Sequence, residues 1–118
     1  MLHHVGIEVG PADLERSVEF WQTIGFSQVE PPASLAEFIW LECGDTQIHL
    51  MPTDLPTTPP RGHTAVVASD FERTVARLRE RGFEVEARRE HWGARRALAI
   101  APGGHRVELM AAPPGPGA

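Results

Sequence analysis

Apolar and polar residues alternate along the first stretch of the chain, from Leu2 to Val9. Three β-branched residues, Val5, Ile7 and Val9, fall on one side of it. A period of two with β-branched residues is typical of a strand that buries one face. Alternation and short apolar runs, bounded by glycines and prolines, predict eight strands in all, over residues 2–9, 26–30, 38–43, 46–51, 63–68, 83–88, 96–101 and 105–111.

Two longer stretches carry the signals of helix ends. The first helix is expected to begin after Asp13, its N-cap, and to run to about Ile24, where Gly25 ends it. The second is expected to begin after Asp70, also an N-cap, and to end before Gly82. Strands and helices that follow one another in this way predict the α+β fold class.

The second half of the chain repeats the first. Asp13–Val18 resembles Asp70–Val75, and Gly44–Met51 resembles Gly103–Met110. The repeat predicts two copies of a strand–helix–strand–strand–strand unit. One helix covers one face of such a sheet, so we expect the two bare faces to enclose a shared cavity. Within a single domain of residues 1–118, the expected parts are a first module (1–52), a proline-rich linker (53–62), a second module (63–112) and a flexible tail (113–118).

Four metal-capable side chains recur at matching places in the two modules. The same interval separates His4 from His49 and His63 from Glu108. If the alternating apolar residues of each strand face the helix, these four side chains point the other way, into the cavity. The pattern predicts one divalent metal ion held by all four, and three imidazoles with one carboxylate suit Zn, Ni, Co, Mn or Fe(II).

Composition narrows the partners and the compartment. The chain has 118 residues, 42% of them hydrophobic, which is enough for a packed core, and its net charge of -5 disfavours a nucleic-acid partner. The single cysteine, Cys43, is expected in the core and fits a reducing compartment. No apolar run is long enough for a membrane span, and the N-terminus lacks the pattern of a signal peptide. These features predict a cytoplasmic protein without a membrane partner, and the bare sheet faces favour a homodimer.

The motifs resemble those of the vicinal oxygen chelate superfamily, also called the glyoxalase/bleomycin-resistance/dioxygenase superfamily. The resemblance is carried by residues 4–9, 13–14, 20–21, 44–50, 62–66 and 103–109. It implies paired βαβββ modules that form a cupped, incomplete β-barrel around a divalent metal. It also implies metal ligands at His4, His49, His63 and Glu108, and assembly as a homodimer.

The function predicted from these ligands is that of a divalent-metal-dependent, glyoxalase-like enzyme of the lyase or isomerase type. It would act on a small substrate with vicinal oxygens. Whether His49 binds the metal distinguishes the lyase or isomerase from an alternative function. If His49 stays unbound, two histidines and Glu108 form the facial triad of an Fe(II) extradiol-type dioxygenase. A metal-free binding protein of the bleomycin-resistance kind is the other alternative.

Further candidates surround the expected metal site. Glu8 shares the cavity face with His4 and is a candidate general base, as is Glu108 if it dissociates from the metal during turnover. Aromatic side chains are candidates for the walls of a substrate pocket, and arginines for holding a substrate anion. The candidate substrate-binding residues are Phe38, Trp40, Trp92, Arg95 and Arg106.

Overall fold

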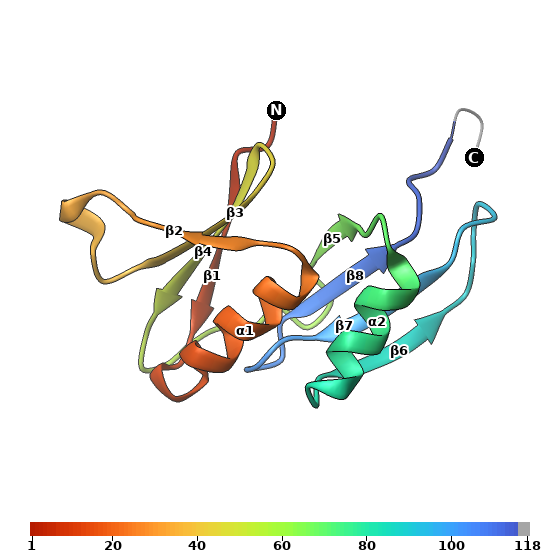
Figure 1. Ribbon diagram of the computed structural model, residues 1–118. Coiled ribbons are helices and arrows are strands. Elements are labelled where there is room, and N and C mark those ends of the chain that lie inside the picture. The colour runs from red at the N-terminus through yellow and green to blue at the C-terminus, as the bar shows by residue number, and fades with distance from the viewer. Residues whose placement is uncertain (116–118) are drawn as a thin grey trace. The chain divides into compact units, whose positions relative to one another are not determined.

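The computed structural model describes residues 1–115, and the chain divides into two compact units (Figure 1). The first unit comprises Met1–Thr58 together with Pro102–Gly104. The second comprises Pro59–Ala101 and the chain from His105 onward. Of the expected flexible tail, residues 113–118, the last three lie outside the described residues.

The first unit holds one four-stranded sheet and the helix α1. Its strands lie in the order β1-β4-β3-β2, with β1 parallel to β4 and the other neighbours antiparallel. The β3–β4 hairpin turns at Gly44, whose φ of +59° suits a glycine. The elements are β1 (His4–Val9), a 3₁₀ turn (Pro11–Asp13), α1 (Leu14–Ile24), β2 (Ser27–Val29), a second 3₁₀ turn (Ala33–Leu35), β3 (Ile39–Cys43) and β4 (Thr46–Pro52).

The second unit has the same topology. Its sheet has the order β5-β8-β7-β6, again with the first strand parallel to the last and antiparallel pairs elsewhere. The elements are β5 (His63–Val67), α2 (Phe71–Glu80), β6 (Glu84–Arg88), β7 (Arg96–Ile100) and β8 (Arg106–Met110). The prediction of an α+β chain with two βαβββ modules is therefore confirmed, and neither four-stranded sheet closes on itself.

The core of each unit lies on one face of its sheet, as the alternation predicts. Ile48 and Leu50 of β4 are at most 1% exposed, and Val107 and Leu109 of β8 are fully buried. In β1, Ile7 and Val9 are buried, while His4, Gly6 and Glu8, which alternate with the β-branched residues, are exposed. The opposite face of each sheet carries polar side chains together with some apolar ones, such as Trp40 and Leu98, and it carries the candidate site.

Two local expectations about the first unit need correction. α1 begins after Asp13, its N-cap residue, as expected, but the Asp13 side chain accepts no capping hydrogen bond. A 3₁₀ turn, in which the Leu14 amide donates to the Pro11 carbonyl, leads into the helix. Cys43 is exposed rather than in the core, because β3 ends there and the chain turns back at Gly44. Asp70, by contrast, does cap α2 by accepting a hydrogen bond from the Arg73 amide.

No helix within residues 1–115 is long and apolar enough to cross a membrane.

Candidate functional site

His63 and Glu108 lie side by side on the open face of the second sheet. His63 begins β5, Glu108 lies on the adjacent strand β8, and His63 Nε2 is 3.5 Å from Glu108 Oε1. The Glu108 side chain is only 12% exposed, whereas that of His63 is 46% exposed. The strand order therefore places the carboxylate within the sheet and the imidazole at its accessible edge.

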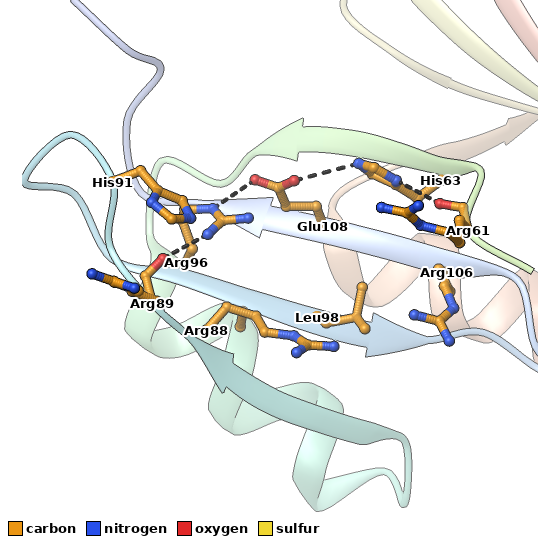
Figure 2. A pocket seen from close by; sticks show the side chains of 10 residues that line it. Arg61, His63, Arg88, Arg89, His91, Arg96, Leu98, Arg106 and Glu108 are labelled. Atoms are coloured by element: carbon orange, nitrogen blue, oxygen red, sulfur yellow. Dashed lines mark hydrogen bonds and ion pairs between the residues drawn. The ribbon is translucent and has the colours of Figure 1, made fainter. Parts of the chain in front are cut away.

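Arg96 of β7 holds the other oxygen of the Glu108 carboxylate. Its Nε donates a 2.9 Å hydrogen bond to Glu108 Oε2, and its Nη1 donates to the Arg89 carbonyl (Figure 2). This bond holds the pKa of the Glu108 carboxyl below its usual value, although burial by itself would raise it. Glu108 is therefore a fixed carboxylate with one oxygen, Oε1, left to face His63.

The backbone decides which nitrogen of His63 carries a proton. His63 Nδ1 lies 3.0 Å from the Arg61 carbonyl oxygen, which can only accept, so Nδ1 must donate. In the neutral imidazole, Nε2 then has a lone pair, and this lone pair faces the Glu108 carboxylate. Two electron-rich atoms at this separation need a positive species between them, either a proton or a metal ion.

A cavity of about 360 Å³ opens beside this pair on the same face of the second unit. Figure 2 shows its side chains rising from strands β5 to β8 and from the loops that flank them. Glu108 is the single carboxylate among the lining residues, which are otherwise rich in arginine. The lining comprises Arg61, His63, Arg88, Arg89, His91, Arg96, Ala97, Leu98, Arg106 and Glu108.

In the first unit, His49 lies between two other rings. Its imidazole stacks on His4 and on Trp40, with ring centroids 4.0 Å apart in each case. Strand pairing sets this up, because Trp40 of β3 is the direct partner of His49 on β4. His49 is consequently buried, with 8% exposure, on the face away from Ile48 and Leu50.

A chain of hydrogen bonds fixes the tautomer of His49. Gln47 Nε2 donates to Glu42 Oε1, which turns Gln47 Oε1 towards His49 Nε2 at 2.7 Å. Nε2 must then donate, which leaves a lone pair on Nδ1 when the ring is neutral. Burial, together with the neighbouring imidazoles of His4 and His3, lowers the pKa of His49 and so favours this neutral form.

The remaining predicted site residues lie in different surroundings. In the first unit, the Glu8 carboxylate accepts a 2.7 Å hydrogen bond from the Thr57 amide, and Phe38 is half-buried just before β3. In the second unit, Arg106 lines the cavity, and Trp92 donates to the Ala112 carbonyl while lying under the Arg96 guanidinium. Arg95 lies over the Phe71 ring of α2 and pairs with Glu72, outside the cavity lining.

Of the five arginines that line the cavity, sequence reasoning singled out only Arg106, and it missed Arg61, Arg88, Arg89 and Arg96. Arg88 ends β6 and is the direct partner of Arg96, so strand alternation places it on the same face. That signal was available once the pairing of β6 with β7 was known. Arg61 lies in the segment before β5, where no periodic pattern exists to orient a side chain.

The donor set fits a divalent metal ion in its chemistry. Imidazole nitrogens and carboxylate oxygens suit borderline transition metals, and they bind as neutral imidazole and ionised carboxylate. Metal–ligand bonds of about 2.1 Å let two donors that share an ion lie up to about 4 Å apart. His63 Nε2 and Glu108 Oε1 meet that requirement at 3.5 Å. In the first unit the His4 and His49 rings stack nearly parallel instead of turning their nitrogens towards one point. Among the described residues, no cluster of three or more side chains suited to a metal forms.

The sequence profile of the Glyoxalase/Bleomycin resistance protein/Dioxygenase superfamily matches residues 1–109. The chain belongs to this superfamily. This match confirms the resemblance that the motifs indicated, at the level of the superfamily. Members of the superfamily bind small molecules and commonly use a divalent metal. No curated protein matches the sequence.

Several solved structures share this fold. A putative glyoxalase family protein from Bacillus anthracis is 23% identical with a TM-score of 0.81, and 93% of each chain is covered. An oxidase, ChaP-H2, is 21% identical with a TM-score of 0.75, covering 100% of this chain and 98% of its own. TnmS3, an antibiotic binding protein from Streptomyces sp. CB03234, is 25% identical with a TM-score of 0.71, and 93% of each chain is covered.

Proposed function

We propose that this chain is a divalent-metal-dependent enzyme of the lyase or isomerase type, acting on a small substrate with vicinal oxygens. Its proposed metal ligands are His4, His49, His63 and Glu108. The observation that carries the proposal is the position of His63 Nε2 at 3.5 Å from the Glu108 carboxylate, with His63 Nδ1 turned to the Arg61 carbonyl. A metal ion bound by the neutral imidazole and the carboxylate would take the place of a proton between them, and the hydrogen bonds of Arg96 and Arg61 already hold the two groups in place.

Zn, Ni, Co, Mn and Fe(II) all suit this donor set. When bound, such an ion supplies Lewis acidity towards the two substrate oxygens. The chain's own residues bind and orient the substrate and move its proton. Arg106 lies at the cavity wall and holds a substrate anion. Glu8 is the proposed general base, with one carboxylate oxygen anchored by the Thr57 amide and the other free to take a proton.

Metal analysis of protein purified without chelators tests this function. We expect near-stoichiometric divalent metal in the wild type after reconstitution, and loss of that metal in His63→Ala. The matched control is His91→Ala, because His91 lines the same cavity but is not a proposed ligand. A wild-type protein that stays metal-free with Zn, Ni, Co, Mn and Fe(II) contradicts the proposal, as does equal metal loss in both variants.

A metal-free binding protein is the second candidate, and the likeness to the antibiotic binding protein TnmS3 supports it. The two candidates differ in what metal does to ligand binding. An enzyme of the proposed kind turns over α-hydroxy-carbonyl or dicarbonyl compounds only when metal is supplied. A sequestering protein binds its ligand equally well before and after treatment with a chelator, without turnover.

We also propose that the protein works as a cytoplasmic homodimer. The open face of each four-stranded sheet and the outer strands of each sheet leave surface that a second copy can cover. The absence of a nucleic-acid partner is part of the same proposal, since the net charge of the chain is -5.

A further inference from the structure

The cavity of the second unit concentrates positive charge on an acidic chain. The chain has 11 basic residues, all of them arginine, and a net charge of -5. Five of these arginines line the same cavity of about 360 Å³, with Glu108 as the single carboxylate among the lining residues. Like charges gathered in a concave site repel one another unless an anion joins them, and such a site attracts anions from solution. The five are Arg61, Arg88, Arg89, Arg96 and Arg106.

Arg96 is already committed to protein partners. It bonds to Glu108 and to the Arg89 carbonyl, and it lies over the Trp92 ring. The guanidinium groups of Arg61, Arg88 and Arg106 have no hydrogen bond or ion pair within residues 1–115, and that of Arg89, which also has none there, points away from Arg88 and Arg106 in Figure 2. These three are therefore available to a ligand, which Arg96 is not.

Two of the three approach an apolar residue from opposite ends of the central strand β7. Arg88 of β6 pairs with Arg96 and Arg106 of β8 pairs with Ile100, so Leu98 lies midway between these two positions along β7. Figure 2 shows the Arg88 and Arg106 side chains flanking Leu98 on the face that also carries Glu108. Each planar guanidinium can bind a carboxylate or phosphoryl group by donating two parallel hydrogen bonds to it.

We propose that this cavity binds a small organic oxyanion, a carboxylate or a phosphorylated compound, through Arg61, Arg88 and Arg106. The apolar Leu98 contacts the carbon skeleton of the ligand. The inference rests on the proposed function for the role of the ligand as substrate, and it narrows the substrate's anionic group to a carboxylate or phosphoryl group held by three arginines. Binding of the anion itself needs only the arginines.

Isothermal titration calorimetry at low ionic strength tests the proposal on the full chain. The protein is first treated with a chelator, so the outcome does not depend on metal. The probes are succinate, inorganic phosphate and uncharged succinamide. We expect at least one of the two anions to bind and succinamide not to bind. The better anion tells whether a carboxylate or a phosphoryl group is the preferred class.

Variants assign the binding to the cavity. We expect Arg88→Gln and Arg106→Gln each to weaken anion binding by about tenfold to a hundredfold, because each removes a charge-assisted hydrogen bond. Arg88→Lys is expected to fall between Arg88→Gln and the wild type, since it keeps the charge but loses the bidentate geometry. Arg73→Gln is the control, because Arg73 is an exposed arginine of α2 outside the cavity lining. Circular dichroism of each variant establishes that it is folded.

Three outcomes overturn the proposal. One is that neither anion binds at millimolar concentration; another is that succinamide binds as well as succinate. The last is that Arg73→Gln weakens binding as much as the cavity variants do, which would indicate general attraction of anions to the surface. If the protein binds an anion but takes up no metal, the anion site is supported and the metal-dependent function is contradicted. Failure of the anion proposal can therefore be told apart from failure of the proposed function.

Discussion

Arg96 Nε and Glu108 Oε2 are joined by a 2.9 Å hydrogen bond in which both side chains are mostly buried, at 16% and 12% exposure. The bond ties a residue of β7 to one on the neighbouring strand β8. It occupies one carboxylate oxygen and leaves the other to face His63. The ionisation and direction of the Glu108 carboxylate therefore depend on one guanidinium.

Replacing this arginine should raise the pKa of Glu108. In Arg96→Met the hydrogen bond and the positive charge are both lost, while the burial that raises the pKa remains. Carboxyl-detected NMR titration measures the change directly. Arg95→Met is the matched control, because Arg95 is the preceding residue but lies over Phe71 and pairs with Glu72. Equal pKa values for Glu108 in the two variants would contradict the assignment.

His49 should separate non-oxidative chemistry from oxygen chemistry. We expect His49→Ala to lower metal affinity and, in parallel, turnover of α-hydroxy-carbonyl or dicarbonyl substrates, because the proposed site then lacks one ligand. His91→Ala is the control, since it also removes an imidazole but His91 is not a proposed ligand. If Fe(II)-loaded wild type instead consumes oxygen with a catechol, and His49→Ala still does so, the dioxygenase alternative holds.

His105 should make the stability of the fold depend on pH. Burial, followed by the nearby His63 imidazole, lowers the pKa of His105 in the folded protein. The unfolded chain then binds more protons than the folded one as the pH falls through about 6.5, so the free energy of unfolding decreases there. Urea unfolding at about pH 7.5 and about pH 5.5 measures this loss.

The variant His105→Gln isolates that effect. It removes the titrating ring, so its free energy of unfolding should fall less than that of the wild type over the same pH interval. His49, whose pKa is also lowered, contributes equally in both proteins and cancels in the comparison. Identical pH dependence in wild type and His105→Gln would show that His105 plays no part.

The two faces of the second sheet should differ in what a leucine contributes to stability. Leu109 of β8 is fully buried on the helix-covered face, and Leu109→Ala should cost about 2–5 kcal/mol of unfolding free energy. Leu98 of β7 is half-buried on the open face, so Leu98→Ala should cost clearly less. Chemical denaturation of both variants provides the comparison, and equal losses would contradict this division of the faces.

Assembly should be visible in solution. We expect a homodimer at micromolar concentration, because a chain of 118 residues with an open sheet face in each unit buries limited area alone. Light scattering coupled to size-exclusion chromatography gives the mass. A monomer at that concentration would contradict the expectation.

The sequence by itself determined the architecture of each unit. Glycines, prolines and alternating residues predicted the ends of every strand to within about two residues of where the structure has them, because turn and strand preferences act over a few neighbours. Alternation also assigned the faces correctly, since adjacent side chains of a strand must point to opposite sides. Val107 and Leu109 accordingly pack with the core, while Glu108 between them faces the cavity.

The tertiary structure alone decided how the site's side chains engage one another. Arg95 and Arg96 are neighbours in sequence, yet one pairs with Glu72 of α2 and the other with Glu108 of β8. The free nitrogen of His63 follows from a bond to the Arg61 carbonyl, and the gathering of arginines follows from strand order. These features depend on rotamers and on partners distant in sequence. A local pattern fixes the face that a side chain takes, but not the group that it meets there.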